Sequence, residues 1–276
     1  MTPGRIGPAS TRPRAMAFRL GAVARAAGYE LHDFDAIGST NAGALAWADA
    51  GGQGPAWFVT ADQTGGRGRR GRPWQGRPGN LAASILLTVD QPLAVAATIG
   101  FVAGLALCDA VDTVAPGDTR ERVSLKWPND ALYGDAKIAG ILLEARGLDG
   151  ATTIVAGIGV NVVSSPEDTP YRATHLQASM PGVTAEDLFV ALSDAWVGTF
   201  ATWRTHGGFP GLRDRWIARA SGIGAPVAVS IGGRTVRGVY ETVDDDGHLV
   251  VGTADGGREV IAAGEVHFGA AATMRS

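Results

Sequence analysis

Short apolar runs separated by glycine- and proline-rich turns make up most of the first two thirds of the chain. Runs of roughly 4–8 residues rich in β-branched and aromatic side chains are typical of strands, whereas helices show a 3.6-residue period over longer stretches. The pattern therefore predicts a sheet with several helices, including a long alanine-rich helix at 93–114 that is apolar enough to be buried. The expected strands are 29–37, 56–61, 81–89, 123–127, 131–133, 137–144 and 152–163, and the other expected helices are 42–50, 184–200 and 210–220.

The character of the sequence changes after Pro226, where short strands are joined by Gly-Gly or Asp-Asp-Gly turns. We therefore expect a large domain at 17–222 followed by a small β-barrel-like domain at 223–270. Residues 1–16 carry three prolines and no apolar period, and we expect them to form a disordered extension. The strands expected in the small domain are 227–231, 234–243, 247–252 and 258–262.

Composition and charge narrow the possible functions. The 276 residues are 45% hydrophobic and 18% charged, which is ordinary for a globular protein, and the formal net charge is −3. General nucleic-acid binders are more often basic. The single cysteine, Cys108, excludes an intramolecular disulfide and suits a reducing cytoplasm. No apolar run reaches about 18 residues without a charge or a string of glycines, so we expect no membrane span.

The most unusual stretch is the arginine loop, residues 65–74, which packs four arginines and four glycines into ten residues and ends in Pro73-Trp74. Such a run cannot form a core helix or a central strand, because glycine is too permissive and guanidinium groups cannot be buried unpaired. Arginine keeps its charge at any working pH and offers a fork of donors suited to phosphate and carboxylate. We therefore expect an anion-binding loop.

Further polar residues follow strand ends. Ser39, Thr40 and Asn41 precede a helical pattern and are either an ordinary helix N-cap or a polar ligand site at a helix start. The segment 126–130, Lys-Trp-Pro-Asn-Asp, could place a lysine, an amide and a carboxylate near a phosphate and Mg²⁺. Lys137 stands in an apolar stretch, where it either faces solvent on a hairpin or points at the same anion.

Several familiar types of site are excluded. The glycines of the arginine loop match a dinucleotide-binding fingerprint only literally, because two prolines and no helical period follow them. The chain contains no P-loop motif, no nucleophile elbow and no histidines at metal-ligand spacing. The chemistry we expect is therefore electrostatic, with arginines, lysines and a metal around a phosphate and no covalent protein nucleophile.

Five sequence blocks occur in an order that closely resembles the biotin protein ligases. The arginine loop and the Lys-Trp-Pro-Asn-Asp block are the most specific of the five, and the resemblance runs from about residue 29 to the C-terminal β-module. The blocks are Ser39-Thr40-Asn41, Gln63 with residues 66–74, residues 126–130, residues 137–142 and residues 157–161.

This resemblance implies an α+β fold: a mixed sheet with helices mainly on one face, as in class II synthetases, followed by an SH3-like barrel. It also implies a two-step reaction, in which biotin and MgATP give biotinyl-5′-AMP and the acyl group then passes to one lysine of the biotin carboxyl carrier domain of acetyl-CoA carboxylase or another carboxylase. Family members that repress transcription carry an N-terminal DNA-binding module, for which there is no room here before residue 29, so we expect no DNA partner. The implied protein is cytoplasmic and a monomer or a homodimer.

The resemblance also implies roles for individual residues. Lys137, Arg69 and Arg67 are expected at the reacting carboxylate, with Arg69 closing over the adenylate to retain it, and Asp130 is expected at the metal. The residues expected around biotin are Ser39, Thr40, Asn41, Gln63, Arg67, Gly68, Arg69 and Lys137. Those expected around ATP are Arg69, Arg72, Trp74, Lys126, Asn129 and Asn161.

Two other functions compete with this one. A lipoate–protein ligase shares the fold and the adenylate chemistry but should lack the arginine loop in this form. A non-enzymatic nucleic-acid binder could use the arginine loop and the β-module, yet it leaves Lys126 and Lys137 unexplained and suits the net charge of −3 poorly. Biotin ligation accounts for more of the chain than either.

Overall fold

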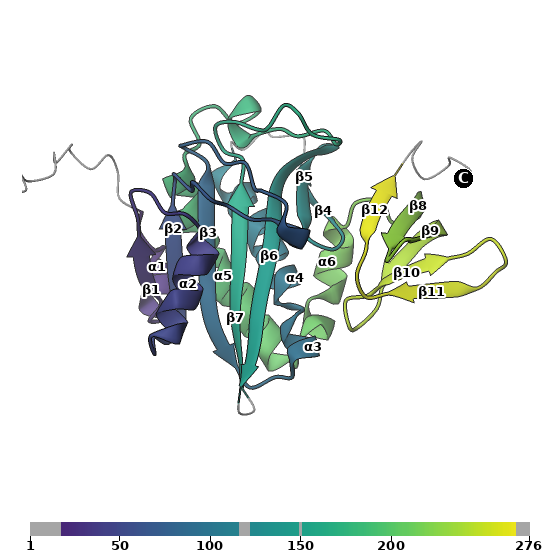
Figure 1. Ribbon diagram of the computed structural model, residues 1–276, viewed down its shortest axis with the longest axis horizontal. Helices are drawn as coiled ribbons and strands as arrows, with labels where there is room; N and C mark the ends of the chain where they lie inside the picture. The colour runs from purple at the N-terminus through teal and green to yellow at the C-terminus, as the bar shows by residue number, and fades with distance from the viewer. Residues whose placement is uncertain (1–17, 116–121, 149–150, 269–276) are drawn as a thin grey trace, which may run out of the picture.

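The computed structural model describes residues 18–115, 122–148 and 151–268, so the predicted extension at 1–16 lies outside the described residues (Figure 1). Its centre is a seven-stranded mixed sheet in the order β1-β2-β3-β7-β6-β5-β4, in which only the β1–β2 pair is parallel. The strands are β1 Glu30–Asp33, β2 Ala56–Thr60, β3 Leu81–Val89, β4 Val123–Lys126, β5 Asp130–Tyr133, β6 Ala136–Leu148 and β7 Ala151–Val160.

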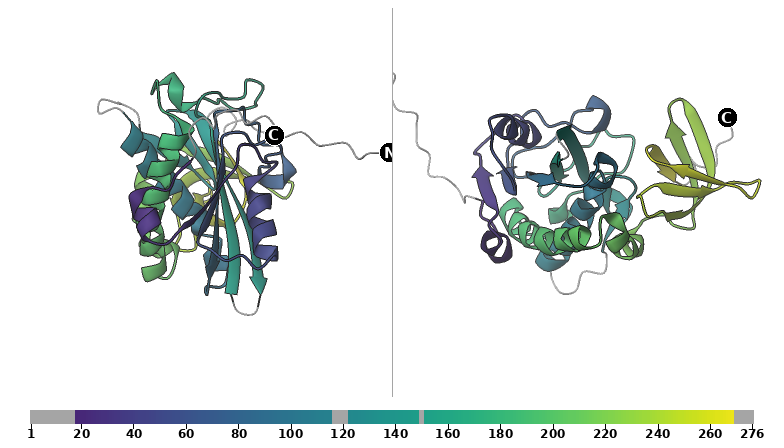
Figure 2. Two further views of the ribbon diagram at one scale, coloured as in Figure 1. Left: turned by 90° about the vertical axis from the view of Figure 1, so that its left-hand side faces the viewer. Right: turned by 90° about the horizontal axis from the view of Figure 1, so that it is seen from below.

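Most helices cover one face of this sheet. The two longest, α4 (Ile99–Val114) and α5 (Ala185–Thr205), pack against each other on that face, and α1 (Ala22–Ala26) lies against α5. The opposite face carries α2 (Thr40–Asp49), which lies over β2 and β3 (Figure 2). The expected mixed sheet with helices mainly on one face is confirmed.

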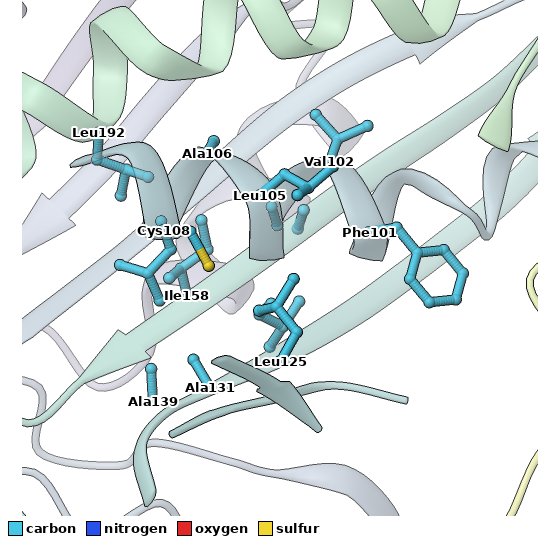
Figure 3. Packing of buried hydrophobic residues seen from close by; sticks show 14 of the residues in the cluster. Phe101, Val102, Leu105, Ala106, Cys108, Leu125, Ala131, Ala139, Ile158 and Leu192 are labelled. Atoms are coloured by element: carbon cyan, nitrogen blue, oxygen red, sulfur yellow. The ribbon is translucent and has the colours of Figure 1, made fainter. Parts of the chain in front are cut away.

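The apolar face of α4 forms the main core. Cys108 points at the sheet, where Ile158 of β7 lies beside it, and Val102 lies on the other side of the helix, which faces α5 (Figure 3). Burial raises the pKa of the Cys108 thiol to about 12, so this cysteine is an inert core side chain, as its place in an apolar helix predicted. Aromatic rings extend this core beneath α5, where Trp57 of β2 meets Trp196 edge to face at 5.5 Å between centroids.

The single helix expected at 93–114 is broken in two, α3 (Leu93–Ala96) and α4. The break covers only Ala97 and Thr98, and the Thr98 hydroxyl donates there to Val95 O at 2.6 Å and accepts from Trp203 Nε1 at 2.8 Å. By length and composition this stretch could cross a membrane, and it is the one stretch of the described residues that could. Most of it is buried in the core, which accounts for its apolarity.

The C-terminal part forms a separate antiparallel sheet in the order β11-β10-β9-β8-β12. The small β-module is therefore confirmed, with one strand more than the sequence pattern indicated, because β12 has only four residues. The strands are β8 Pro226–Ile231, β9 Arg234–Val243, β10 Leu249–Gly252, β11 Arg258–Ile261 and β12 Glu265–Phe268.

The turn between β9 and β10 joins this sheet to the rest of the protein. Trp127 Nε1 donates to Gly247 O at 2.9 Å, and Arg213 Nε donates to Val243 O at 2.7 Å. Gly247 has a φ of +82° and lies so close to Phe101 that a Cβ would fall 2.3 Å from its ring. Only glycine fits this turn without strain, so the turn fixes how the two sheets meet.

Several predicted boundaries shift by a few residues. The strand expected at 29–37 ends at Asp33, and Ile37 only bridges to Gln63. The helix expected at 210–220 begins later, as α6 (Arg213–Arg219), because a 3₁₀ turn precedes it at Phe209–Gly211. Neither shift moves a predicted site residue to another part of the fold.

Candidate functional site

A cavity of about 680 Å³ lies between the seven-stranded sheet, the arginine loop and the start of β12. Residues from all five sequence blocks line it, although these blocks are up to 120 positions apart in the chain. The predicted site residues that line it are Ser39, Thr40, Asn41, Gln63, Arg67, Gly68, Arg69, Arg72, Trp74, Lys126, Asn129, Asp130 and Lys137.

One end of the cavity is built by the start of α2. Ser39 is the N-cap of this helix and accepts from Ala42 N, so the ordinary capping role is present. Thr40 and Asn41 are buried, and the amide of Thr40 donates to Gln63 Oε1 at 2.9 Å. The same three residues therefore form both the N-cap of α2 and a polar wall of the cavity. The two predictions for this segment, a helix cap and a polar ligand site, are compatible.

Two polar residues behind this end have no counterpart among the predicted site residues. Ser84 of β3 lies 2.7 Å from Thr40 Oγ1 and 2.6 Å from Asn41 Oδ1. Glu144 of β6 accepts from Asn41 Nδ2 at 2.8 Å. Each is a polar residue in or next to an otherwise apolar strand sequence. That contrast is the only sequence signal that could have predicted a role for them in the site.

Glycines form the floor of the cavity. A Cβ on Gly157 would fall 2.2 Å from Asn41 Oδ1, and one on Gly159 would fall 2.6 Å from the Trp74 ring. A Cβ on Gly140 would lie 3.1 Å from the six-membered ring of the same indole. The glycines of β6 and β7 therefore give the backbone room for Asn41 and for Trp74 to lie flat on the sheet.

Lys137 lies in the cavity wall rather than on a solvent face. Its ammonium is 2.6 Å from Asp130 Oδ1, and its side chain is only 16% exposed. It also lies over two rings, 5.8 Å from the Trp74 centroid and 5.2 Å from that of Tyr171. The interpretation that pointed this lysine into the site is therefore the one that the geometry supports.

The arginine loop folds back on itself as a short hairpin. Trp74 N donates to Gly66 O at 2.9 Å and Gly68 N donates to Arg72 O at 2.7 Å. Arg70, at the tip, has a φ of +58°, which is the one positive φ of a non-glycine residue in the described parts of the chain. The tip is thus a tight turn that directs successive arginines to different sides.

Contacts with the C-terminal sheet hold this turn. Arg72 makes a bidentate pair with Glu265 at 2.8 and 3.0 Å, and Arg70 reaches the same carboxylate at 3.1 Å. Hydrogen bonding to Arg72 is the main cause that lowers the pKa of Glu265, against the opposing effect of burial. Glu265 lines the cavity, and its partners are 193 and 195 positions away, so no local sequence signal could have found it.

Arg69 points inward. Its guanidinium donates to Asn129 Oδ1 at 3.0 Å and to Gly264 O at 3.4 Å, and Asn129 Nδ2 in turn donates to Ile141 O. Partial burial lowers the pKa of Arg69, and it also lowers the pKa of Lys126, whose ammonium lies 5.5 Å from the Phe268 ring centroid. Positive charge is therefore held in a partly desolvated place, where an anion would be bound strongly.

Asn161 is the predicted site residue that does not line the cavity. It is buried at the end of β7, where its Nδ2 donates to Thr174 O at 3.1 Å and its main-chain N–H donates to Ile138 O at 2.7 Å. It fixes the segment that carries Tyr171 past Lys137, since Lys137 N donates to Arg172 O at 2.8 Å.

Comparisons with known proteins agree with this geometry. Residues 39–161 match the model of the Biotin/lipoate A/B protein ligase family, and residues 222–269 match that of the Biotin protein ligase C terminal domain. The chain is 38% identical over 241 residues to the biotin–[acetyl-CoA-carboxylase] ligase of Paracoccus denitrificans, covering 84% of this chain and 97% of that protein. It is 36% identical over 243 residues to the enzyme of the same name from Mycobacterium tuberculosis, covering 83% and 85%.

A solved structure shows the same fold. The biotin protein ligase from Aquifex aeolicus, in complex with biotin and ATP, superposes with a TM-score of 0.72 at 24% identity, covering 86% of this chain and 97% of that one. With the family models, the two relatives and the cavity in agreement, the chain belongs to the biotin protein ligase family.

Proposed function

We propose that this chain joins biotin to ATP as biotinyl-5′-AMP and then transfers the biotinyl group to a lysine of a biotin carrier protein. The observation that carries the proposal is one cavity with two kinds of wall. A neutral polar end is built by Thr40, Asn41 and Gln63, and a cationic part is built by Arg69, Lys126 and Lys137. The neutral ring of biotin needs a polar wall without charge, whereas the biotin carboxylate and the ATP phosphates need a cationic wall.

Biotin lies with its ring system at the polar end. Ser39, Thr40, Asn41 and Gln63 surround the ring, and the Gly68 backbone lets the chain approach it closely. The carboxylate then points towards Lys137, Arg67 and Arg69. The polar side chains that line this end of the cavity together, the buried Thr40 and Asn41 with Gln63, support this placement.

The first step brings a carboxylate oxygen to the α-phosphorus of ATP, and a P–O bond forms as pyrophosphate leaves. Two anions repel each other, so the step needs fixed positive charge that is already in place. Lys137 supplies it from a position defined by its contacts with Asp130 and with the rings of Trp74 and Tyr171. Arg69 and Arg67 stabilise the same region, and Arg69 then covers the mixed anhydride.

ATP occupies the side of the cavity formed by Arg72, Trp74, Lys126 and Asn129. The Trp74 ring offers a flat face for a base, and the cations face the phosphates. Asn161 contributes indirectly, through the segment that it holds beside Lys137.

The residues in the cavity fit Mg²⁺. This ion is bound in many enzymes by one or two carboxylates together with substrate phosphates and water, and Asp130 places one carboxylate beside the phosphate side of the cavity. Asp130 would hold the ion, which neutralises phosphate charge when it is bound. In the free protein the same carboxylate holds Lys137.

In the second step the uncharged amine of the carrier lysine attacks the acyl carbon, an N–C bond forms and AMP leaves. The acceptor is the biotin carboxyl carrier domain of acetyl-CoA carboxylase, and other carboxylases can be served in the same way. The proposal includes a cytoplasmic monomer or homodimer with catalytic residues in 17–222 and a second domain at 223–270.

A biotin-dependent exchange of labelled pyrophosphate into ATP tests the first step. We expect exchange with biotin and Mg²⁺, and none with lipoate or without an acid. Transfer to a purified carrier domain, read as a mass increase on one lysine, tests the second step. Lipoate-driven or acid-independent exchange would overturn the proposal, and binding of nucleic acid without exchange would favour the non-enzymatic alternative.

A further inference from the structure

Glu144 lies behind the cavity wall and does not line it. Its carboxylate Oε2 accepts from Asn41 Nδ2 at 2.8 Å, and the same amide nitrogen lies 3.4 Å from Leu142 O. Asn41 is only 5% exposed, and its amide packs so closely on the Gly157 backbone that an added Cβ there would fall 2.2 Å from Asn41 Oδ1. The Asn41 side chain is therefore fixed from behind by a charged group.

This contact determines which end of the amide faces which neighbour. A carboxylate can only accept hydrogen bonds, so the NH₂ end of Asn41 must face Glu144. The carbonyl end then faces Ser84, whose Oγ lies 2.6 Å from Asn41 Oδ1. Because a carbonyl oxygen cannot donate, the single proton of the Ser84 hydroxyl lies on this bond.

The direction continues to Thr40. With its proton committed to Asn41, the Ser84 oxygen accepts, and the Thr40 hydroxyl at 2.7 Å is its nearest donor. The alternative acceptor for Thr40, Gln63 Oε1, is farther away at 3.2 Å and already accepts from the Thr40 main-chain N–H. The Thr40 oxygen therefore keeps its lone pairs for the cavity, and Gln63 turns its NH₂ end away from Thr40.

We infer that Glu144 is a positioning residue that sets the direction of the hydrogen-bond chain through Asn41, Ser84 and Thr40, and thereby makes this end of the cavity accept N–H groups. The inference rests on the proposed function, because it concerns recognition of the biotin ring. That ring is a cyclic urea with two N–H donors. The dithiolane ring of lipoate has no N–H donor and would gain nothing from these acceptors.

The chain supplies a matched control. Arg146, two residues further along the same face of β6, pairs with Asp49 of α2 at 2.7 Å, and both side chains are exposed. This pair also joins β6 to α2, but it does not touch Asn41. Loss of general β6–α2 contact can therefore be separated from loss of the Asn41 orientation.

The experiment compares Glu144→Leu, Glu144→Gln and Arg146→Leu in the pyrophosphate exchange assay. For Glu144→Leu we expect the KM for biotin to rise about 10-fold or more, the size expected for losing a hydrogen bond to a charged group, with the KM for ATP unchanged. Glu144→Gln keeps a carbonyl acceptor and should stay within about threefold of the unaltered protein. Arg146→Leu should leave both KM values unchanged.

A second readout is specific to hydrogen-bond direction. The unaltered protein should prefer biotin over biotin methylated on a ring nitrogen, and Glu144→Leu should lose most of that preference. If Glu144→Leu does not fold, Ser84→Ala, which removes the middle link, must give the same rise in biotin KM. The inference is wrong if biotin KM and ring preference are unchanged, or if Arg146→Leu matches Glu144→Leu. Absence of biotin-dependent exchange in the unaltered protein would instead refute the proposed function.

Discussion

Arg69, Lys126 and Lys137 of the cavity each make different contacts, and none of the three is fully exposed to water. Lys137 is held by Asp130 and two rings, Arg69 by Asn129 and the Gly264 carbonyl. Burial lowers the pKa of Arg69 and of Lys126, which means that the charged form of each is partly desolvated. An anionic ligand relieves that cost, so the site favours the anionic intermediate over a neutral molecule of the same shape.

Arg69→Gly should release the intermediate. The change removes the guanidinium that reaches from the loop to Asn129 and leaves Lys137 untouched. We expect adenylate formation to continue while free biotinyl-AMP escapes and labels lysines on unrelated proteins. Streptavidin blotting of a reaction containing serum albumin measures this. Arg70→Gly, which adds the same flexibility beside it, should stay selective, and equal labelling by both variants would remove the retaining role from Arg69.

Lys137→Met should slow the first step itself. Loss of a fixed charge aimed at a developing negative charge typically costs about 10²–10³ in rate. We therefore expect kcat for pyrophosphate exchange to fall by roughly this factor, with a smaller change in the KM for biotin, which keeps its contacts at the polar end. Chemically prepared biotinyl-AMP should restore much of the transfer to carrier protein. A variant that exchanges at normal rate would show that Lys137 is not at the reacting centre.

At the scale of elements, β7 supplies the floor of the site. Its pattern of Gly157, Ile158 and Gly159 alternates between the cavity, the core and the cavity again. Strand alternation places Ile158 against α4 and both glycines under ligand-facing side chains. The strand is therefore regular despite its two glycines. The glycines are needed because side chains from other elements, Asn41 and Trp74, pack directly on the strand backbone.

This explains how far sequence reasoning reached. The sequence pattern located every strand of the large sheet, because each strand carries its own pattern of burial. It predicted one long helix through Thr98, because the residue that bonds to the Thr98 hydroxyl at the break, Trp203, lies 105 positions away. The resemblance to the family identified most of the residues that line the cavity. It did not identify Glu265 and Ser84, because their roles depend on partners in other elements.

Gly159→Ala tests the floor directly. The added methyl group would fall 2.6 Å from the Trp74 ring, so the ring must shift. We expect the KM for ATP to rise several-fold while the KM for biotin stays within about twofold, since Asn41 lies over Gly157 instead. Gly147→Ala in β6, where a Cβ meets nothing within 4 Å, is the matched control. Equal effects of both changes would show that the strand, rather than Trp74, responds.

At the scale of the whole molecule, the C-terminal sheet holds the arginine loop. The adjacent residues Gly264 and Glu265 contact Arg69, Arg70 and Arg72 of the loop. The turn at Gly247 fixes the same sheet to Trp127 at its other end. The second sheet therefore determines where the loop lies before any ligand arrives, although most site residues belong to the first.

Glu265→Gln should free the loop. The arginines are trypsin sites, and we expect trypsin to cut the ligand-free variant within residues 67–72 several times faster than the unaltered protein. Glu259→Gln is a matched control, since Glu259 is equally exposed at 38% and pairs with Arg234 inside the C-terminal sheet. Similar cutting of all three proteins would show that Glu265 does not hold the loop.

The same contact should depend on pH in a defined direction. Hydrogen bonding to Arg72 lowers the pKa of Glu265 in the folded protein. A carboxyl group whose folded pKa lies below its unfolded value, about 4.3 for glutamate, stabilises the fold fully above that value and loses this effect as the pH falls through the folded pKa. The Tm of the unaltered protein should therefore exceed that of Glu265→Gln at pH 7 by a small amount, because the pair is partly exposed. In 20 mM salt the difference should be larger than in 500 mM salt, since ions screen exposed pairs. It should vanish towards pH 3, and a difference that persists or grows in acid would mean that the Glu265 side chain stabilises the protein by packing and not by its charge.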